Sequence, residues 1–347
     1  MKRQSLRLAT WNVAWMNALF DDQGGLLDDD EPSSRYGVSR AGQLAAIGIV
    51  LTALDADGIM LIEAPDQSAR RSCVRALETL ARRIGLRARR AVVGFASDTE
   101  QEIAFLYDPD VIEARHDPQG EPATSHGAPL HLAPRFDTGL RHDADGDGNE
   151  ELIRFSKPPL ELAVTTAHRK LRLIGVHAKS KAPHGADSAE EARRISIANR
   201  RKQLAECTWV RARVEGHLAA GDSLMVMGDF NDGPGLDKYE QLFGVSGVEL
   251  VMGLRLPRPQ RLFDPHAFLA INQRGGLTPT TARFWNPVHK CYFEALLDYI
   301  MVSHDLFTKG ARWRIWHPFN DPGVAGVAEL SAAVLAGSDH FPVTVDM

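Results

Sequence analysis

The chain has 347 residues, of which 44% are hydrophobic and 24% charged, as is usual for a globular protein with a sizeable core. No apolar run reaches the roughly 18 residues that a membrane-spanning helix needs, so the composition excludes a transmembrane protein. The formal net charge of −5 argues against strong non-specific binding of duplex nucleic acid. A local basic patch or a bound metal ion would still attract an anionic substrate.

The three cysteines, Cys73, Cys207 and Cys291, are far apart and odd in number. This pattern is neither a disulfide framework nor a zinc site, and it predicts three buried or half-buried thiols in a reducing compartment. The basic start of the chain runs into a strand-like segment, without the apolar stretch of a secretory signal. We therefore expect a cytoplasmic protein, with export after removal of an upstream leader as the open alternative.

Short apolar runs alternate with longer amphipathic patterns in the first part of the chain. They predict the strand Leu6–Val13, the helix Gly42–Leu54, the strand Gly58–Ile62, the helix Ser68–Ile84, and the strands Ala91–Phe95 and Ile103–Tyr107. A polar stretch rich in proline, glycine and histidine, residues 108–151, follows these elements. Its composition predicts a surface insertion.

The alternation resumes after the insertion. It predicts the strands Leu160–Thr166 and Leu171–His177, the helix Ser188–Glu215, and the strands Ser223–Met227, Ala295–Val302, Arg312–Trp316 and Phe341–Val345. Because no repeat and no linker divides the chain, we expect one α/β domain over residues 1–347, with sheets covered by helices. Arginines gather around the second helix and at the start of the longest one. Without interleaved aromatic residues, they are expected to form solvated outer faces.

Polar side chains stand at the ends of the apolar strands. They are Asn12, Glu63, His177, Asp229, Asn231, Asp298, Asp339 and His340. Each alone is typical of a turn, but neighbouring strands present their ends along one edge of a sheet, so together these residues predict a site. Four carboxylates brought close repel one another unless a cation neutralises them, and oxygen ligands suit Mg²⁺ or Mn²⁺.

Six segments around these residues resemble the endonuclease/exonuclease/phosphatase superfamily, the deoxyribonuclease I-like fold. They are Thr10-Trp11-Asn12, the strand that ends at Glu63, His177-Ala178-Lys179-Ser180-Lys181, Gly228-Asp229-Phe230-Asn231-Asp232, Leu297-Asp298-Tyr299-Ile300, and Ser338-Asp339-His340-Phe341-Pro342. The Gly-Asp-Phe-Asn and Ser-Asp-His-x-Pro elements are the most specific. The resemblance implies an α/β fold of the α+β type, a four-layered αββα sandwich of two packed mixed sheets flanked by helices.

The resemblance also implies a metal site and a water-activating site. Glu63 would be the principal ligand of Mg²⁺ or Mn²⁺, with Asn12 and Asp339 beside it. Asp229 would orient or deprotonate the attacking water, and Asn231 would hold the scissile phosphate. These parts match what phosphoryl transfer to water requires.

The two histidines complete the implied site. Asp298 would position His340 as a charged or proton-transferring dyad, and His177 would bind phosphate or protonate the leaving oxygen. Abasic-site nucleases of the family lack a histidine at the position of His177, which argues against that branch. Glu100 or Glu102 is expected to orient His177. Lys157 resembles a basic residue that contacts phosphate, with a strand-entry lysine as the equal alternative.

The insertion contains a second candidate metal site. Asp143, Asp145 and Asp147 alternate as in a calcium loop, with a glycine between the last two. The twelfth position of such a loop is Arg154 here, where a bidentate glutamate is needed. A flexible acidic turn is therefore preferred to a weak Ca²⁺ site.

The sequence predicts a divalent-metal-dependent phosphodiesterase whose partner is a phosphodiester substrate, with nucleic acid as the first choice. A phosphoesterase acting on lipid or small-molecule substrates, such as sphingomyelin or inositol phosphates, is the alternative, because one fold serves several substrates. A catalytically silent binding module is the alternative of another class. It is disfavoured because every polar residue that the chemistry requires is present. Substrate specificity is expected to come from the insertion and from the Pro-rich region 253–286.

Overall fold

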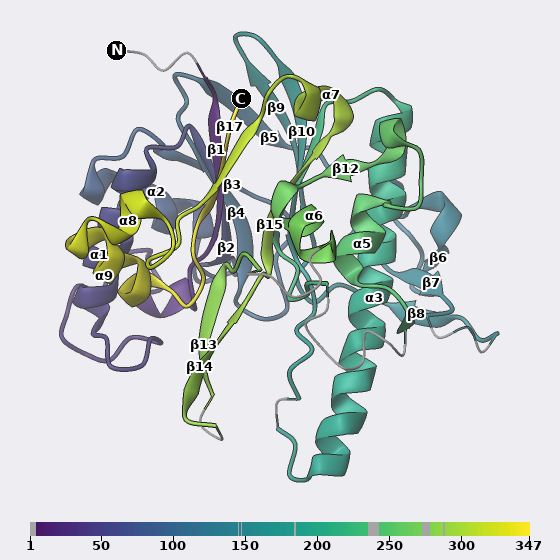
Figure 1. The fold of residues 1–347 in the computed structure, drawn as a ribbon, viewed down its shortest axis with the longest axis horizontal. Coiled ribbons are helices and arrows are strands. Elements are labelled where there is room, and N and C mark those ends of the chain that lie inside the picture. Colours follow the sequence, from purple (N-terminus) through teal and green to yellow (C-terminus); the bar gives the residue numbers. More distant parts are fainter. Residues whose placement is uncertain are drawn as a thin grey trace.

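The computed structural model describes residues 5–144, 146, 148–183, 185–234, 243–272, 278–286 and 289–347. Two six-stranded sheets pack face to face, and helices cover the outer face of each, so four layers follow one another across Figure 1. Both sheets are mixed. The arrangement confirms the αββα sandwich that the resemblance implied.

The first sheet has the strand order β16-β17-β1-β2-β4-β3. Its strands are β1 (Arg7–Asn12), β2 (Gly58–Ala64), β3 (Arg90–Val93), β4 (Glu102–Tyr107), β16 (Arg312–Ile315) and β17 (Val343–Asp346). The strands β1 and β2 run parallel, with Asn12 opposite Ile62. The carboxyl ends of these two strands therefore meet at one edge of the sheet, beside Glu63.

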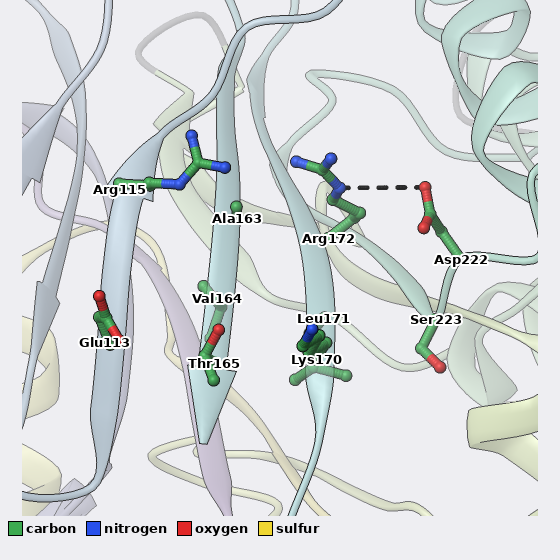
Figure 2. A pocket seen from close by; sticks show the side chains of 10 residues that line it. All are labelled: Glu113, Arg115, Ala163, Val164, Thr165, Lys170, Leu171, Arg172, Asp222 and Ser223. Carbon is green, nitrogen blue, oxygen red and sulfur yellow. Dashed lines mark ion pairs between the residues drawn. The ribbon is translucent and has the colours of Figure 1, made fainter. Parts of the chain in front are cut away.

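The second sheet has the strand order β12-β15-β11-β10-β9-β5. Its strands are β5 (Ile112–His116), β9 (Leu160–Thr166), β10 (Lys170–His177), β11 (Leu224–Asp229), β12 (Leu262–Phe263) and β15 (Asp298–Ser303). Near the start of β10, charged side chains line a shallow hollow of about 290 Å³ (Figure 2). Arg172 Nε lies 3.9 Å from Asp222 Oδ2 there.

Helices form the two outer layers. On the first sheet lie α1 (Arg40–Leu54), α2 (Cys73–Ile84), α8 (Pro322–Ala325) and α9 (Ala328–Gly337), and on the second lie α3 (Ala189–Ala219), α5 (Gly247–Met252) and α6 (Pro265–Asn272). The short helix α7 (His304–Thr308) follows β15, and single 3-10 turns occur at η1 (Met16–Leu19), η2 (Leu130–Leu132) and η3 (Arg258–Gln260). In the part of the chain that the structure describes, no helix combines the length and apolarity needed to cross a membrane.

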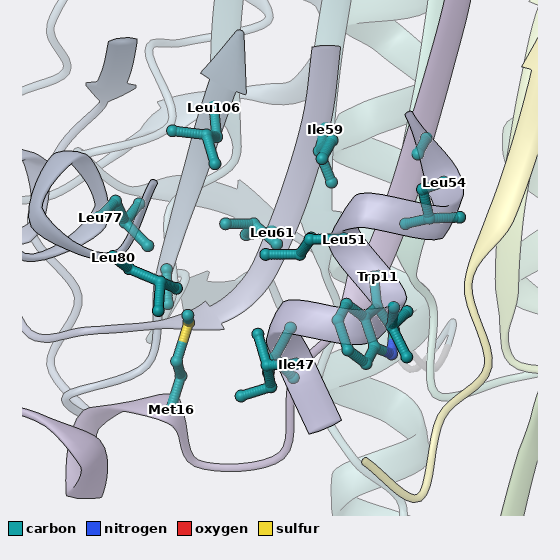
Figure 3. Close-up of a cluster of buried hydrophobic side chains, with 14 of the residues drawn as sticks. Trp11, Met16, Ile47, Leu51, Leu54, Ile59, Leu61, Leu77, Leu80 and Leu106 are labelled. Carbon is teal, nitrogen blue, oxygen red and sulfur yellow. The ribbon is translucent and has the colours of Figure 1, made fainter. Parts of the chain in front are cut away.

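Three apolar clusters hold the layers together. One lies between the first sheet and its helices, one between the second sheet and its helices, and one between the two sheets. In the first cluster Trp11 of β1 packs among Ile47 and Leu51 of α1, with Leu80 of α2 beyond them (Figure 3). Trp11 is fully buried, and its Nε1 donates to the backbone oxygen of His340 at 2.9 Å. This cluster therefore also supports the edge of the sheet where the predicted site lies.

Two additions stand outside the main sheets. A three-stranded sheet consists of β6 (Ala128–Pro129), β7 (Leu140–His142) and β8 (Glu151–Ile153), and a hairpin consists of β13 (Ala282–Asn286) and β14 (Cys291–Ala295). The predicted insertion 108–151 thus contains β5, an edge strand of the second sheet, as well as most of the small sheet. The hairpin and the first half of α3 extend from the same end of the molecule (Figure 1).

Several sequence expectations need correction. Cys291 is exposed on the hairpin, whereas Cys73 and Cys207 are buried as expected, and all three are free thiols. Arg200, one of the arginines near the start of the longest helix that were expected on a solvated face, is fully buried. Its charge is offset there by Asp232, whose Oδ1 lies 2.6 Å from Arg200 Nη1. The helix expected from residue 68 begins only at Cys73. The strand expected over 295–302 is interrupted, since the hairpin ends before β15 begins.

Candidate active site

The carboxyl ends of strands from both sheets open into one cleft of about 570 Å³. Eight of the residues predicted for catalysis, metal binding or phosphate binding line this cleft: Asn12, Glu63, Lys157, His177, Asp229, Asn231, Asp339 and His340. Asp298 lies directly behind His340, with its Oδ2 at 2.7 Å from the Nδ1 of that imidazole. The structure therefore brings together the residues that the sequence placed at separate strand ends.

The register of the second sheet sets three of these residues in a row. β10 and β11 are parallel with His177 opposite Asp229, and β11 and β15 are antiparallel with Asp229 opposite Asp298. Opposed residues in adjacent strands point to the same side of a sheet. The strand pairing itself thus places Asp229 between the other two.

Asp229 is the centre of the cleft. Its Oδ2 accepts a hydrogen bond from Asn12 Nδ2 at 2.9 Å and lies 3.8 Å from His177 Nε2 and 3.9 Å from His340 Nε2. Its Oδ1 accepts the backbone N–H of Asn231 at 2.7 Å. Burial raises the pKa of Asp229 to about 6, although the nearby His340 works in the opposite direction. A carboxylate with such a pKa is suited to accept a proton near neutral pH.

The backbone on both sides of Asp229 has conformations that few residues adopt. Gly228 has φ +137°, and a Cβ atom there would lie 2.0 Å from the backbone oxygen of Val176. Only glycine fits this close approach of β11 to β10. Asn231 has φ 49°, in the left-handed region, and its Nδ2 donates to the Ala178 oxygen at 3.1 Å. These two backbone conformations explain why the Gly-Asp-Phe-Asn motif has glycine at its first position and asparagine at its last.

Glu63 sits in a bulge of β2. The register with β4 shifts between Ile62 and Ala64, and Glu63 has φ 62°. Strained non-glycine residues of this kind are concentrated at functional sites. The carboxylate accepts the backbone N–H of Trp15 at 2.8 Å, and burial raises its pKa above the ordinary value.

His340 forms a buried dyad with Asp298. Burial alone would lower the pKa of His340, but the carboxylates of Asp298 and Asp229 raise it to about 10. The imidazole is therefore positively charged at neutral pH. Thr281 supports the dyad, because its hydroxyl oxygen accepts the backbone N–H groups of Leu297 and Asp298 at 3.0 and 2.9 Å.

His177 has the opposite electrostatic character. Burial lowers its pKa well below the ordinary value, and the positive charges of Lys157 and His340 lower it further. Its Nε2 lies 3.2 Å from Lys157 Nζ, which also donates to Gln101 Oε1 at 3.4 Å. The expectation that Glu100 or Glu102 orients His177 is wrong. Glu100 accepts a hydrogen bond from Asn17, and Glu102 accepts the N–H groups of Gln67 and Ser97.

Two groups of residues in the cleft are candidates for a metal ion. Asp229, Asp298 and His340 have ligand atoms within 4.8 Å of one another. A charged imidazole does not ligate a metal, however, and that charge is favoured here. On the other side, Asn12 Oδ1 is buried with no hydrogen-bond partner among the described residues, while Asn12 Nδ2 donates to Glu63 Oε1 at 3.5 Å. An unpartnered amide oxygen in a cleft that carboxylates line fits a hard cation such as Mg²⁺.

The structure adds residues in or beside the cleft that the sequence did not indicate. Arg35 Nη1 lies 3.1 Å from Asp339 Oδ2, from a loop that carries no motif. Phe284 of the hairpin meets the ring of His340 edge to face at 5.5 Å between centroids. Glu206 of α3 is buried in the wall of the cleft, and burial raises its pKa to about 7. Of these three, only Phe284 lies within the region 253–286 that the sequence predicted to confer specificity.

The two remaining surface features lie away from the cleft. In the candidate calcium loop Asp143 accepts the backbone N–H groups of Gly146 and Gly148 at 2.7 and 2.9 Å. Asp145 and Asp147 lie outside the described residues. The hollow of Figure 2 is at the start of β10, at the opposite end of that strand from His177.

Comparison with known proteins places the chain among phosphoester hydrolases. The model of the endonuclease/exonuclease/phosphatase family matches residues 9–340. Truncated TDP2 of Caenorhabditis elegans aligns with a TM-score of 0.51 and 13% identity over 99% of this chain and 97% of that chain, which shows the shared fold. The 3′ phosphatase NExo from Neisseria, solved with a product DNA hairpin, aligns with a TM-score of 0.49 and 15% identity over 98% of each chain. No curated protein matches the chain in sequence.

Proposed function

The chain belongs to the endonuclease/exonuclease/phosphatase family, an enzyme family that hydrolyses phosphoester bonds, and on this premise we propose a divalent-metal-dependent phosphodiesterase acting on nucleic acid. One observation carries the proposal. Asp229 Oδ2 lies within 4 Å of the Nε2 atoms of both His177 and His340. The carboxylates beside His340 raise the pKa of its imidazole, whereas burial lowers the pKa of His177. A proton acceptor beside a fixed positive charge is what the attack of water on a phosphodiester needs.

The proposed metal site consists of Glu63, Asn12 and Asp339. The orphaned Asn12 Oδ1 and the cleft-lining carboxylates support it. When bound, Mg²⁺ or Mn²⁺ neutralises the carboxylates and stabilises the negative charge that develops on a non-bridging phosphate oxygen. Arg35 holds the Asp339 carboxylate from the side of the first sheet.

The remaining residues divide the work of binding and proton transfer. Asp229 accepts a proton from the attacking water, while the amide of Asn231 binds a non-bridging oxygen of the phosphate. His340, kept charged by Asp298, stabilises the transition state electrostatically. Lys157 and the neutral His177 bind a second non-bridging oxygen. The lowered pKa of His177 favours this binding role over donation of a proton to the leaving group. The leaving alkoxide takes its proton from solvent water, and Asp229 returns the proton of the attacking water to solvent.

The test compares a small substrate with a polynucleotide. Hydrolysis of bis(p-nitrophenyl) phosphate and nicking of supercoiled plasmid are measured with Mg²⁺, with Mn²⁺ and with EDTA. We expect metal-dependent hydrolysis of both substrates. The rate should fall at least about 100-fold in His340→Ala, because a charged catalytic group is removed. His168→Ala, which removes an exposed histidine from a turn, is the matched control and keeps full activity. Hydrolysis that persists in EDTA, or in His340→Ala, contradicts the proposal.

A further inference from the structure

A second groove adjoins the cleft on the side of α3. It runs between β8 and α3, has a volume of about 380 Å³, and is lined by Arg154, Arg201 and Lys202 together with Glu151 and Leu152. Arg154 is exposed, and Arg201 and Lys202 are half-buried. Three cationic side chains and one carboxylate, that of Glu151, thus line this groove.

Lys202 joins the groove to the cleft. Its Nζ donates to Ser156 Oγ at 3.2 Å and lies 3.9 Å from Glu206 Oε1. Both Ser156 and Glu206 line the cleft, as do Lys157 and Lys179. A band of positive charge therefore leads from the neighbourhood of His177 along α3 to Arg154.

This band of positive charge would reduce the repulsion between an acidic protein and a polyanionic substrate. The chain is acidic overall, and the cleft itself contains Glu63, Asp229 and Asp339. A metal ion at the cleft offsets those carboxylates for one phosphate, but the neighbouring phosphates of a polymer need cations of their own. The groove offers such cations on the α3 side of the cleft. Arg154 Nη2 donates to a neutral acceptor, the Ser125 oxygen at 3.3 Å, so that its charge stays available.

We propose that the β8–α3 groove binds the phosphates that flank the scissile phosphate in a polynucleotide strand, with Arg154 and Arg201 as the principal contacts. The proposal rests on the phosphodiesterase function of the cleft and names the direction in which the substrate strand leaves it. It also assigns a role to β8, which follows directly on the predicted insertion. Leu152 is the single large exposed hydrophobic residue among those that line the groove, whereas three of its lining side chains are cationic, which favours phosphate over a lipid chain as the ligand.

Binding is measured first, without turnover. Fluorescence anisotropy in EDTA follows single-stranded DNA of about 20 nucleotides, longer than the sites of about 4–16 nucleotides that such strands occupy. We expect Arg154→Ala/Arg201→Ala to weaken binding at least about tenfold at low salt, and to reduce the slope of log K against log salt by about 1.4, which is 0.7 for each lost phosphate contact. Arg82→Ala/Arg83→Ala, the same charge change on exposed positions of α2, leaves binding unchanged. If the groove variant is misfolded by circular dichroism, Arg154→Glu alone carries the test, because that side chain is exposed.

Turnover separates this inference from the proposed function. With Mg²⁺ or Mn²⁺, we expect the groove variant to raise KM for the oligonucleotide at least about tenfold. We expect kcat/KM for bis(p-nitrophenyl) phosphate, which has no flanking phosphates, to stay unchanged. Unaltered oligonucleotide binding in the groove variant overturns the inference and leaves the phosphodiesterase intact. Hydrolysis of sphingomyelin vesicles by a protein that does not bind the oligonucleotide also overturns it. A protein that binds the oligonucleotide through the groove but hydrolyses neither phosphodiester refutes the proposed function alone.

Discussion

Replacement of Asp298 by asparagine isolates the electrostatics of the dyad. The variant keeps the shape of the residue 2.7 Å from His340 Nδ1 but removes its negative charge. The difference between the pKa of about 10 and the ordinary 6.5 corresponds to roughly 5 kcal/mol of preference for the charged imidazole. This is a ceiling for Asp298, because Asp229 contributes to the same shift. Without Asp298, burial dominates, and we expect the pKa of His340 to fall toward or below its ordinary value.

The consequence for stability has a definite sign. Because the folded pKa of His340 lies above the ordinary one, the charged dyad stabilises the fold fully below pH 6.5, and this stabilisation is lost as the pH rises toward 10. In urea unfolding, the free energy of unfolding of the wild type should therefore fall as the pH rises over this range. That of Asp298→Asn should not show this fall. NMR titration of the His340 imidazole measures the pKa directly. We expect activity of the variant at pH 8 to fall about 100-fold or more, since the imidazole is then neutral. An imidazole that titrates near 6.5 in the wild type refutes the reasoning.

Three further predictions concern the metal, the backbone and the buried ion pair. Glu63→Gln should weaken Mn²⁺ binding at least about tenfold, as measured by isothermal titration calorimetry. An unchanged affinity would mean that the ion binds elsewhere. Gly228→Ala should destabilise the protein by about 1–3 kcal/mol or more in urea unfolding, whereas Gly216→Ala, with open space around the added Cβ, should not. Arg200→Met leaves Asp232 buried with Lys181 as its remaining cation, so we expect a loss of about 3 kcal/mol, and the double variant with Asp232→Asn should recover part of it.

The parts of the fold that could be predicted from sequence are those with a short-range signal. The strand 160–166 was predicted with its observed bounds, because an apolar run there is bounded by turn residues. The cleft residues were found because polar side chains at strand ends interrupt apolar runs. Their grouping followed from the geometry of parallel strands, and the structure confirms the fold that the motifs implied.

The parts that could not be predicted depend on long-range contacts. β5 alternates apolar and polar residues over too few positions to be recognised as a strand. Its partner strand, β9, lies about 50 residues further along the chain. Burial of Arg200 depends on partners from other segments, among them Asp232 and the backbone oxygen of Val245. The bulge at Glu63 and the ion pair between Arg35 and Asp339 leave no local pattern, because both arise from how separate segments meet.

The row of His177, Asp229 and Asp298 across three adjacent strands has a consequence for how this protein can diversify. Backbone hydrogen bonds hold neighbouring strands about 4.8 Å apart. The sheet itself therefore fixes the distances between these three side chains. The surrounding loops do not set that spacing. Residues 117–150, which exclude Lys157, and the part of the β13–β14 hairpin beyond Phe284 can therefore lengthen, shorten or change in charge while the reacting groups keep their separation. We expect substrate choice to change through these segments without loss of the chemistry.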